Sequence, residues 1–268
     1  TATIADQCRE LAAKGVTTST YGLGNDFNEE LMVAMAKAGQ GNHYYGDTAD
    51  DLMEPFQEEF DLLANLCLKG LTLMASVPSG AKVELLNDYA GNAQQGWRLP
   101  DIAWGAEAWA VLRIRLPKGM LPPEGQSLPC IDVSVTGCDL DGNSIAVQQA
   151  GLALPALNSA ALGAVAEDEL VVRRLAELEA AGVLTRTREA ARNHDWNRVD
   201  RLLAEAEQRF AGNDWVASVV EAIRTVAKSR SRERFMKEAL YSASSFSQRH
   251  AGKDEGIELM ESSKAMYL

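Results

Sequence analysis

The sequence predicts three consecutive parts: a short α/β segment, an antiparallel β-sandwich and a helical bundle. Helical and strand-like patterns alternate over residues 1–64, apolar residues recur with a period of two over 65–154, and helical stripes return over 155–268. These ranges are the three domains that we expect. With 268 residues, of which 46% are hydrophobic, the chain can bury a sizeable core.

The first part begins with an amphipathic helix over residues 4–14 and a compact strand over 16–21, whose β-branched residues suit burial on both faces. Asn25 or Asp26 is expected to cap the helix that follows. Gly39 and Gly41 end this helix.

A second short strand is expected over residues 42–45, and a long helix capped by Asp47 or Thr48 follows it. The two strands and the helix between them form a right-handed βαβ unit. The apolar face of the long helix is formed by Leu52, Phe56, Phe60 and Leu63.

The sandwich is predicted from short strands separated by turn signals. Residues 118–129 are expected to form a loop, because three prolines disfavour strand pairing there. Asp139–Asn143 is interpreted as a hairpin turn. It is not an EF-hand loop, because Ser144 stands where that loop needs glycine. The expected strands cover residues 71–77, 82–86, 108–116 and 131–135, and Trp97, Trp104 and Trp109 are expected in the core.

Residues 151–164 show no clear period and are interpreted as a linker. Four amphipathic stripes follow, which predicts a bundle or an array of helical hairpins. Asn213 or Asp214 is expected to cap the third helix. The stripes are Val171, Leu175 and Leu178; Val199, Leu202, Leu203, Ala206 and Phe210; Val216, Val219, Val220, Ile223 and Val226; and Phe235, Met236, Leu240 and Ala243.

The net charge of -12 argues against nucleic acid and anionic membrane surfaces as partners. No run of about 18 apolar residues predicts a membrane span. We expect free thiols, although Cys130 and Cys138 could pair across a hairpin. The expected free thiols and the absence of an Asn-x-Ser/Thr sequon favour a cytoplasmic location.

No catalytic constellation is visible in the sequence. The Gly-x-Ser-x-Gly and Walker lysine motifs are missing. Gly22-Leu23-Gly24 lacks the third glycine of a dinucleotide-binding loop, because Phe27 stands in its place. We therefore expect no enzyme activity, no cofactor, and no catalytic, cofactor-binding or metal-binding residues.

Residues 15–32, with Gly22-Leu23-Gly24 after a strand, and residues 36–45, with Gly39-Gln40-Gly41 before an aromatic strand, resemble the closing third of a von Willebrand factor type A (VWA) domain. The resemblance continues through the helix to Leu63. The following region is similar to the β-rich part that accompanies such domains in bacterial VWA proteins and inter-alpha-trypsin inhibitor heavy chains, where residues 105–112 match a recurrent phrase.

This resemblance implies a Rossmann-like segment that is truncated. The family's metal-ion-dependent adhesion site takes its ligands from strands that precede the matched region, so metal-mediated binding is not expected in this chain. The resemblance implies a non-catalytic protein-interaction or scaffold protein of a bacterial cytoplasmic assembly, with an AAA-type ATPase as one candidate partner. The alternatives are a fragment of a metal-dependent surface adhesion protein and a hydrolase with its site in the sandwich.

The resemblance also implies that the strand over residues 16–21 lacks its inner neighbour. An unpaired apolar edge needs cover. We expect that edge to be met by a second copy in a homo-oligomer, by a packed helix, or by disorder. Pairing of this strand on both sides within one chain would contradict the resemblance.

Overall fold

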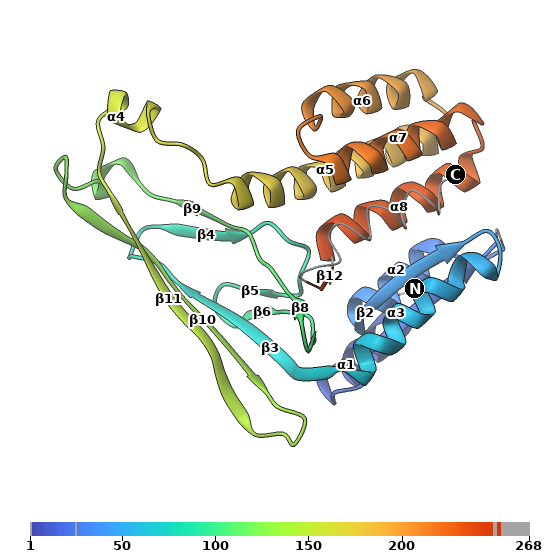
Figure 1. Cartoon of the computed structure of the whole chain (residues 1–268), viewed down its shortest axis with the longest axis horizontal. Coiled ribbons are helices and arrows are strands. Elements are labelled where there is room, and N and C mark those ends of the chain that lie inside the picture. The colour runs from blue at the N-terminus through green and yellow to red at the C-terminus, as the bar shows by residue number, and fades with distance from the viewer. Residues whose placement is uncertain (1, 25, 249–250, 253–268) are drawn as a thin grey trace. The chain divides into compact units, whose positions relative to one another are not determined.

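The computed structural model describes residues 2–24, 26–248 and 251–252 and has a mixed α/β fold (Figure 1). The chain forms two compact units. Unit 1 contains Thr1–Asn65, Trp104–Glu107 and Arg173–Leu268, and unit 2 contains Leu66–Ala103 and Ala108–Val172. Segments from both ends of the chain therefore belong to the same unit.

Unit 1 contains a parallel pair of strands, β1 (Thr18–Leu23) and β2 (Gln40–Gly46), connected by helix α2 (Glu29–Ala38). Tyr21 lies opposite Tyr44 in their register. The predicted βαβ unit is present.

The helix caps in this region differ from the prediction. The N-cap of α2 is Asn28, whose side chain accepts a hydrogen bond from the Leu31 backbone N–H. Asp26 lies too far before the first helical turn to act in this way, and Asn25 lies outside the described residues.

Two further helices belong to the N-terminal part of unit 1: α1 (Ala2–Ala13), which packs on α2, and α3 (Met53–Ala64). A short 3₁₀ turn, η1 (Asp50–Leu52), separates α3 from the expected caps Asp47 and Thr48. Thr48 instead donates from its backbone N–H and its hydroxyl to the Asp51 carboxylate, so this polar contact closes the turn before the helix begins.

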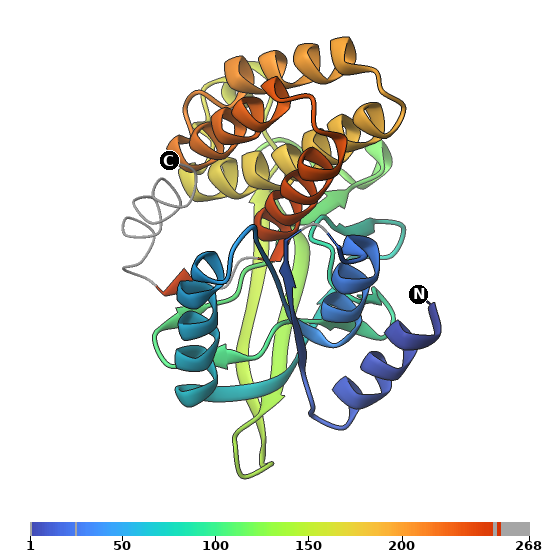
Figure 2. The ribbon, with the colours of Figure 1, turned by 90° about the vertical axis from the view of Figure 1, so that its right-hand side faces the viewer.

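The rest of unit 1 is mainly helical, and four helices from the C-terminal part share one hydrophobic core. Figures 1 and 2 show these helices side by side. Asn213 caps the third of them as predicted. The core contains Leu184, Leu203, Val220, Ile223 and Phe235, which are fully or almost fully buried. The helices are α5 (Glu169–Arg192), α6 (Trp196–Arg209), α7 (Asp214–Lys228) and α8 (Arg232–Gln248).

The start of α5 buries charged residues, where an apolar stripe was predicted. Val171 is exposed, whereas Arg174 and Glu177 are buried. Arg174 forms ion pairs with Glu177 and with Glu107 of the short strand β8 (Ala106–Glu107). An arginine can be buried here because two carboxylates compensate for its lost hydration.

Unit 2 consists mainly of antiparallel strands, and its largest sheet is built around three long ones. The edge strand β11 (Ser144–Pro155) pairs with β10 (Ser127–Cys138), which pairs with β3 (Leu66–Ser76). The remaining strands of this sheet are β6 (Gly96–Arg98), β5 (Gly91–Asn92) and β7 (Ile102–Ala103), and a separate pair is formed by β4 (Lys82–Leu85) and β9 (Leu112–Arg115).

Both sheets of unit 2 contribute to one apolar cluster. Leu71, Leu73, Trp97 and Leu99 are buried at its centre, and residues of β4, β9 and β10 pack around them. Trp97 therefore lies in the core as predicted. Trp104 does not, because its side chain is 85% exposed and its segment belongs to unit 1.

Two segments that were predicted as irregular are paired strands. Pro129 pairs with Ala153, next to an irregularity in the ladder where a missing N–H is tolerated. Residues 151–155 belong to β11, and the short helix α4 (Ser159–Gly163) occupies much of the rest of the expected linker. The expected strand over 108–116 is shorter and begins at Leu112.

The Asp139–Asn143 segment forms the predicted hairpin turn between β10 and β11. The Asp139 carboxylate accepts hydrogen bonds from the backbone and the side chain of Asn143, and Gly142 adopts a φ of 87°. Glycine suits this left-handed backbone. All four cysteines are free, including Cys130 and Cys138.

The shared helical core predicts a large effect of a cavity at Leu203. Leu203→Ala removes a fully buried side chain from α6 and should lower the free energy of unfolding by about 2–5 kcal/mol. Leu202→Ala, at the half-buried neighbouring position, is the control and should cost clearly less. Urea denaturation followed by circular dichroism measures both, and equal losses would contradict the observed packing.

Candidate interaction surface

One face of the β1–β2 pair is held to α3 by a carboxylate. Glu59 of α3 accepts hydrogen bonds from Ser19 of β1 and, at 2.7 and 2.8 Å, from the Asn42 amide and the Tyr44 hydroxyl of β2. Tyr21 stacks on Tyr44, with ring centroids 4.9 Å apart. These contacts fix the rotation of α3 about its axis.

The rotation leaves much of the predicted apolar face of α3 exposed. The side of α3 that faces the strands carries Pro55, which is buried, and Glu59. Phe56 lies beside β1, since its ring centroid is 5.6 Å from that of Tyr21. The exposed apolar stripe consists of Met53, Phe56, Phe60 and Leu63, with exposed fractions of 66%, 59%, 60% and 55%. We call these four residues the α3 stripe.

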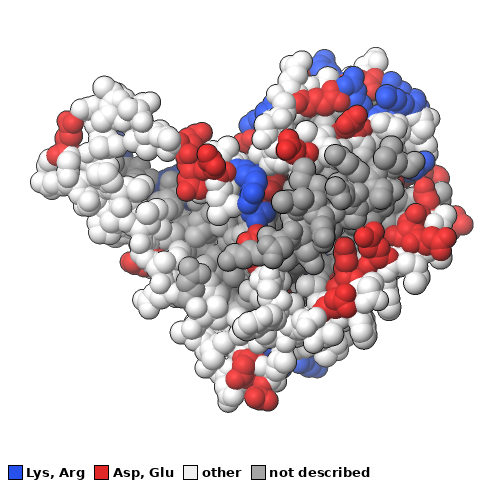
Figure 3. Space-filling view, in the orientation of Figure 1, with Lys and Arg blue, Asp and Glu red and all other residues white. Residues whose placement is uncertain are grey.

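The outer side of α3 is acidic. Glu54, Glu58 and Asp61 are exposed on α3 and recur at helical spacing. Figure 3 shows acidic side chains gathered at the lower right of the view, in the region of α3. The α3 stripe therefore lies between the β1 side of the helix and a negatively charged border.

The strand beside the α3 stripe has an open edge. Among the described residues β1 pairs only with β2, which agrees with the one-sided pairing that the VWA resemblance implies. Val16 and Leu23, near the two ends of this strand, are 52% and 53% exposed. An open strand edge bordered by apolar side chains is a template for strand addition.

The opposite face of the β1–β2 pair is covered by α2 and α8. Buried Thr20 of β1 donates to the Met32 carbonyl of α2 and contacts His43 Nδ1 of β2 at 2.9 Å. The His43 ring lies 6.5 Å from the ring of Tyr241 on α8. Burial lowers the pKa of His43 to about 4, so the imidazole is neutral at pH 7.

Helix α8 places two buried charged residues near the carboxyl ends of β1 and β2. Lys237 is 4% exposed, and its ammonium group donates to the Gly24 carbonyl and lies 4.2 Å from the centroid of the Phe27 ring. Glu238 is 7% exposed, and burial raises its pKa to about 7, with Asp47 also raising it and Arg234 lowering it.

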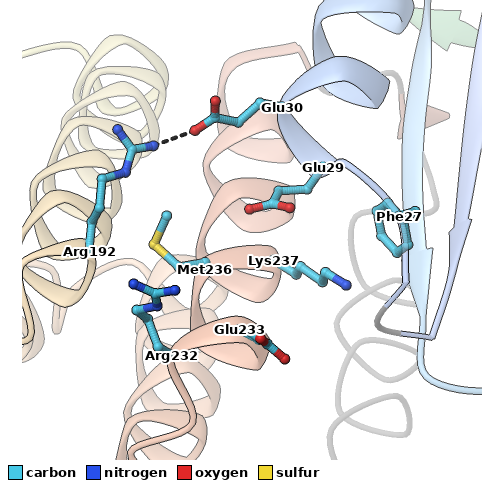
Figure 4. A pocket seen from close by; sticks show the side chains of 8 residues that line it. All are labelled: Phe27, Glu29, Glu30, Arg192, Arg232, Glu233, Met236 and Lys237. Carbon is cyan, nitrogen blue, oxygen red and sulfur yellow. Dashed lines mark hydrogen bonds and ion pairs between the residues drawn. The ribbon is translucent and has the colours of Figure 1, made fainter.

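A cleft of about 510 Å³ opens beside Lys237. Figure 4 shows its lining, in which the Lys237 side chain extends toward Phe27 and Glu30 is ion-paired with Arg192. Three carboxylates face three cationic groups, so no single ligand charge is favoured. The lining residues are Phe27, Glu29, Glu30, Arg192, Arg232, Glu233, Met236 and Lys237.

Gly22-Leu23-Gly24 lies at the end of β1. As the sequence predicted, the Phe27 ring occupies the space that close packing of a helix against the strand would need there. A Cβ atom at Gly22 would lie 2.2 Å from the Phe27 ring, so the ring fills the space beside the strand. The basic cluster over residues 228–234 is partly neutralised, since Arg230 binds Asp200 and Arg234 pairs with Asp47.

The described part of the chain contains neither a candidate metal site nor a candidate membrane span. No three His, Cys, Asp or Glu side chains of these residues are grouped so that they could hold a metal ion. None of the described helices has the length and apolar character of a membrane span.

The sequence did not predict the exposed stripe or the buried charges of α8. The α3 stripe has the pattern of a core-facing helix, and pattern alone does not tell whether a partner surface is present in the same chain. Lys237 and Glu238 carry no local signal for burial, because Gly24 and Asp47, which lie near them in the fold, are about two hundred positions earlier in the sequence.

The raised pKa of Glu238 predicts a pH-dependent gain from Glu238→Gln. Between pH 4.5 and about 7 the folded protein retains a proton that the unfolded chain releases, so the contribution of Glu238 to stability falls as pH rises through this window. The variant lacks this loss. Its stability relative to wild type should therefore increase from pH 5 to pH 8, by about 1–3 kcal/mol.

Thermal and urea unfolding at pH 5, 6, 7 and 8 test this expectation. The neutral His43 contributes in the opposite direction below pH 6.5, but it is present in both proteins and cancels in the comparison. The control is Glu233→Gln, an exposed carboxylate on the same helix. A Glu238→Gln effect that is the same at every pH would show that the buried carboxylate is already ionised throughout.

Comparison with solved structures identifies a similar fold. No protein-family model and no curated protein matches the sequence. The structure is similar to that of a von Willebrand factor type A protein from Catenulispora acidiphila, with a TM-score of 0.59 and 12% sequence identity. The likeness covers 89% of this chain and 60% of that one, so the chain spans about three fifths of the protein it matches. The chain therefore has a VWA-like fold.

Proposed function

We propose that this chain is a non-catalytic protein-interaction module, in which unit 1 binds a protein partner through the open edge of β1 and the α3 stripe. One observation carries the proposal: four large apolar side chains of one helix are more than half exposed beside an unpaired strand edge. Contiguous apolar surface of this kind marks binding sites for other polypeptides.

The surface also suggests the chemistry of the partner. An apolar segment would cover Phe56 and Phe60, and basic side chains at its border would meet Glu54, Glu58 and Asp61. A strand of the partner can add to β1 through main-chain hydrogen bonds. Self-association at this same edge, the homo-oligomer considered from the sequence, would bring the acidic borders of two copies toward each other, which favours a different protein as the partner.

The biological setting is part of the same proposal. The VWA-like fold belongs to a class of domains that bind other proteins, which supports a scaffold role, and the resemblance adds a bacterial cytoplasmic assembly with an AAA-type ATPase as a candidate partner. We also propose that the chain binds its partner without a metal ion. The alternative is a metal-dependent surface adhesion protein, since the chain spans only 60% of the similar protein.

We further infer that unit 2 is the predicted antiparallel sandwich and that helices α5–α8 form the predicted bundle. The two sheets of unit 2 share the cluster around Leu71 and Trp97, which supports an antiparallel sandwich. Helices α5–α8 share the core around Leu203 and Ile223, which supports a bundle.

A substitution in the α3 stripe tests the interaction. Phe60→Ser removes an exposed ring without opening a cavity, so folding should be preserved while partner affinity falls about tenfold or more. The partner is first identified by affinity capture of the full-length protein from its native cell, with and without a chelator. Binding of the purified partner is then titrated against wild type and variant by calorimetry.

The matched control is Leu162→Ser on α4, an exposed leucine in unit 2 that lies outside this surface. It should bind like wild type. Affinity should also fall with added salt, because the acidic border of α3 contributes. A partner that is lost with the chelator would support the adhesion alternative, and equal binding by all three proteins would refute the proposed surface.

A further inference from the structure

The edge strand of the large sheet in unit 2 is exposed along most of its length. Every residue of β11 whose side chain is described is exposed, apart from half-buried Ile145. Leu152 and Leu154 are 48% and 50% exposed. Among the described strands β11 pairs only with β10, so its outer edge presents unpaired backbone groups.

The composition of β11 differs from that of the rest of the chain. Residues 142–166 contain no Lys, Arg, Asp or Glu, although 24% of all residues are charged and the net charge is -12. Figure 3 shows mostly uncharged surface along the diagonal that β11 follows in Figure 1. β11 itself therefore brings no charge to a contact between two copies. The carboxylate beside the strand is that of Asp132 on β10, which pairs with Gly151 and lies over it.

The strand also lacks the devices that usually protect a sheet edge. Edge strands are blunted by charges, by internal proline, or by bulges. In β11 the bulge lies near Val147, where the register with β10 shifts, and the proline is the last residue, Pro155. Residues 148–152 pair with β10 without a shift. A second shift lies between Leu152 and Ala153, but the extra residue there is Cys130 of β10, so β11 itself continues without an inserted residue from 148 to 154.

We propose that two copies of this chain associate through β11, whose residues 148–154 pair antiparallel with the same residues of the second copy around a two-fold axis near Gly151. A two-fold axis perpendicular to a sheet relates identical edges in antiparallel directions. The strand pairs observed in unit 2 are antiparallel too, so the new pair continues the same sheet.

The pairing also covers apolar side chains. Leu152 lies on the same face of the sheet as Ile131, its partner on β10, and in the proposed register it sits beside Ala150 of the other copy. The pair repeats on the other side of the axis. Each copy therefore shields an exposed leucine with a small apolar neighbour and satisfies backbone groups of the open edge.

Charge substitutions at Ala150 test the proposal in the full chain by sedimentation velocity over a range of concentrations. Wild type should form a dimer whose fraction rises with concentration. Ala150→Lys places like charges on diagonal neighbours across the axis and should raise the dissociation constant about tenfold or more, as should Ala150→Glu. An equimolar mixture of the two variants should associate again, which a misfolded variant could not do.

Ala160→Lys on α4 adds the same charge off the strand and should dimerise like wild type. Hydrogen exchange of the backbone amides of residues 148–154 should slow on dimerisation. A wild-type protein that stays monomeric, a dimer unaffected by Ala150→Lys, or a mixture that does not recover would overturn the proposal. These variants leave the α3 stripe unchanged, so a failure of this proposal is distinguishable from a failure of partner binding at unit 1.

Discussion

A parallel sheet of only two strands has two apolar faces to cover and two edges to satisfy, and unit 1 is organised by this constraint. Parallel strands are stable when helices cover both faces. The segment between β1 and β2 supplies one helix, and α3, which follows β2, covers the other face through Glu59. Helix α2 covers only part of its face of the strand pair. Helix α8, from the far end of the sequence, covers the rest of that face.

This long-range cover explains why charged residues are buried at that position. Helix α8 must meet the apolar core of α5–α7 on one side and the ends of β1 and β2 on another. The strand ends present a carbonyl, two aromatic rings and acidic side chains. Lys237 matches the carbonyl and the rings. Burial, and then the nearby carboxylates of Asp47 and Asp51, raise the pKa of Glu238 and so favour its protonated form. The joint between α8 and the strands is therefore polar and specific, unlike the apolar core of α5–α7.

Local patterns were sufficient to predict most elements, and long-range contacts account for the differences. The βαβ unit, the Asp139–Asn143 hairpin and the four long helices follow from periodicity, turn residues and caps such as Asn213. The prediction of a linker over 151–164 was wrong for residues 151–155, which belong to β11. Small, uncharged residues at a sheet edge give only a weak strand signal in the sequence. The exposure of the apolar face of α3 could not be predicted from the sequence, because the inward-facing residue is Glu59, which accepts hydrogen bonds from three polar groups of the strands. A hydrophobicity pattern does not identify an inward-facing carboxylate.

The two open edges differ in what surrounds them, and this difference assigns them different partners. At β1, the apolar α3 stripe is bordered by Glu54, Glu58 and Asp61, so a two-fold contact would oppose like charges, whereas a basic partner would be attracted. At β11, the strand and its flanking sequence carry no charge from 142 to 166, and the Asp132 carboxylate of β10 lies over Gly151, so this edge offers much less charge to a partner than the α3 border does. With little charge to select a different protein, shape and strand direction determine which polypeptide binds this edge. A second copy of the same uncharged strand, running antiparallel, is the most complementary partner. An acidic protein that needs both a partner and a second copy can therefore separate the two contacts by charge alone.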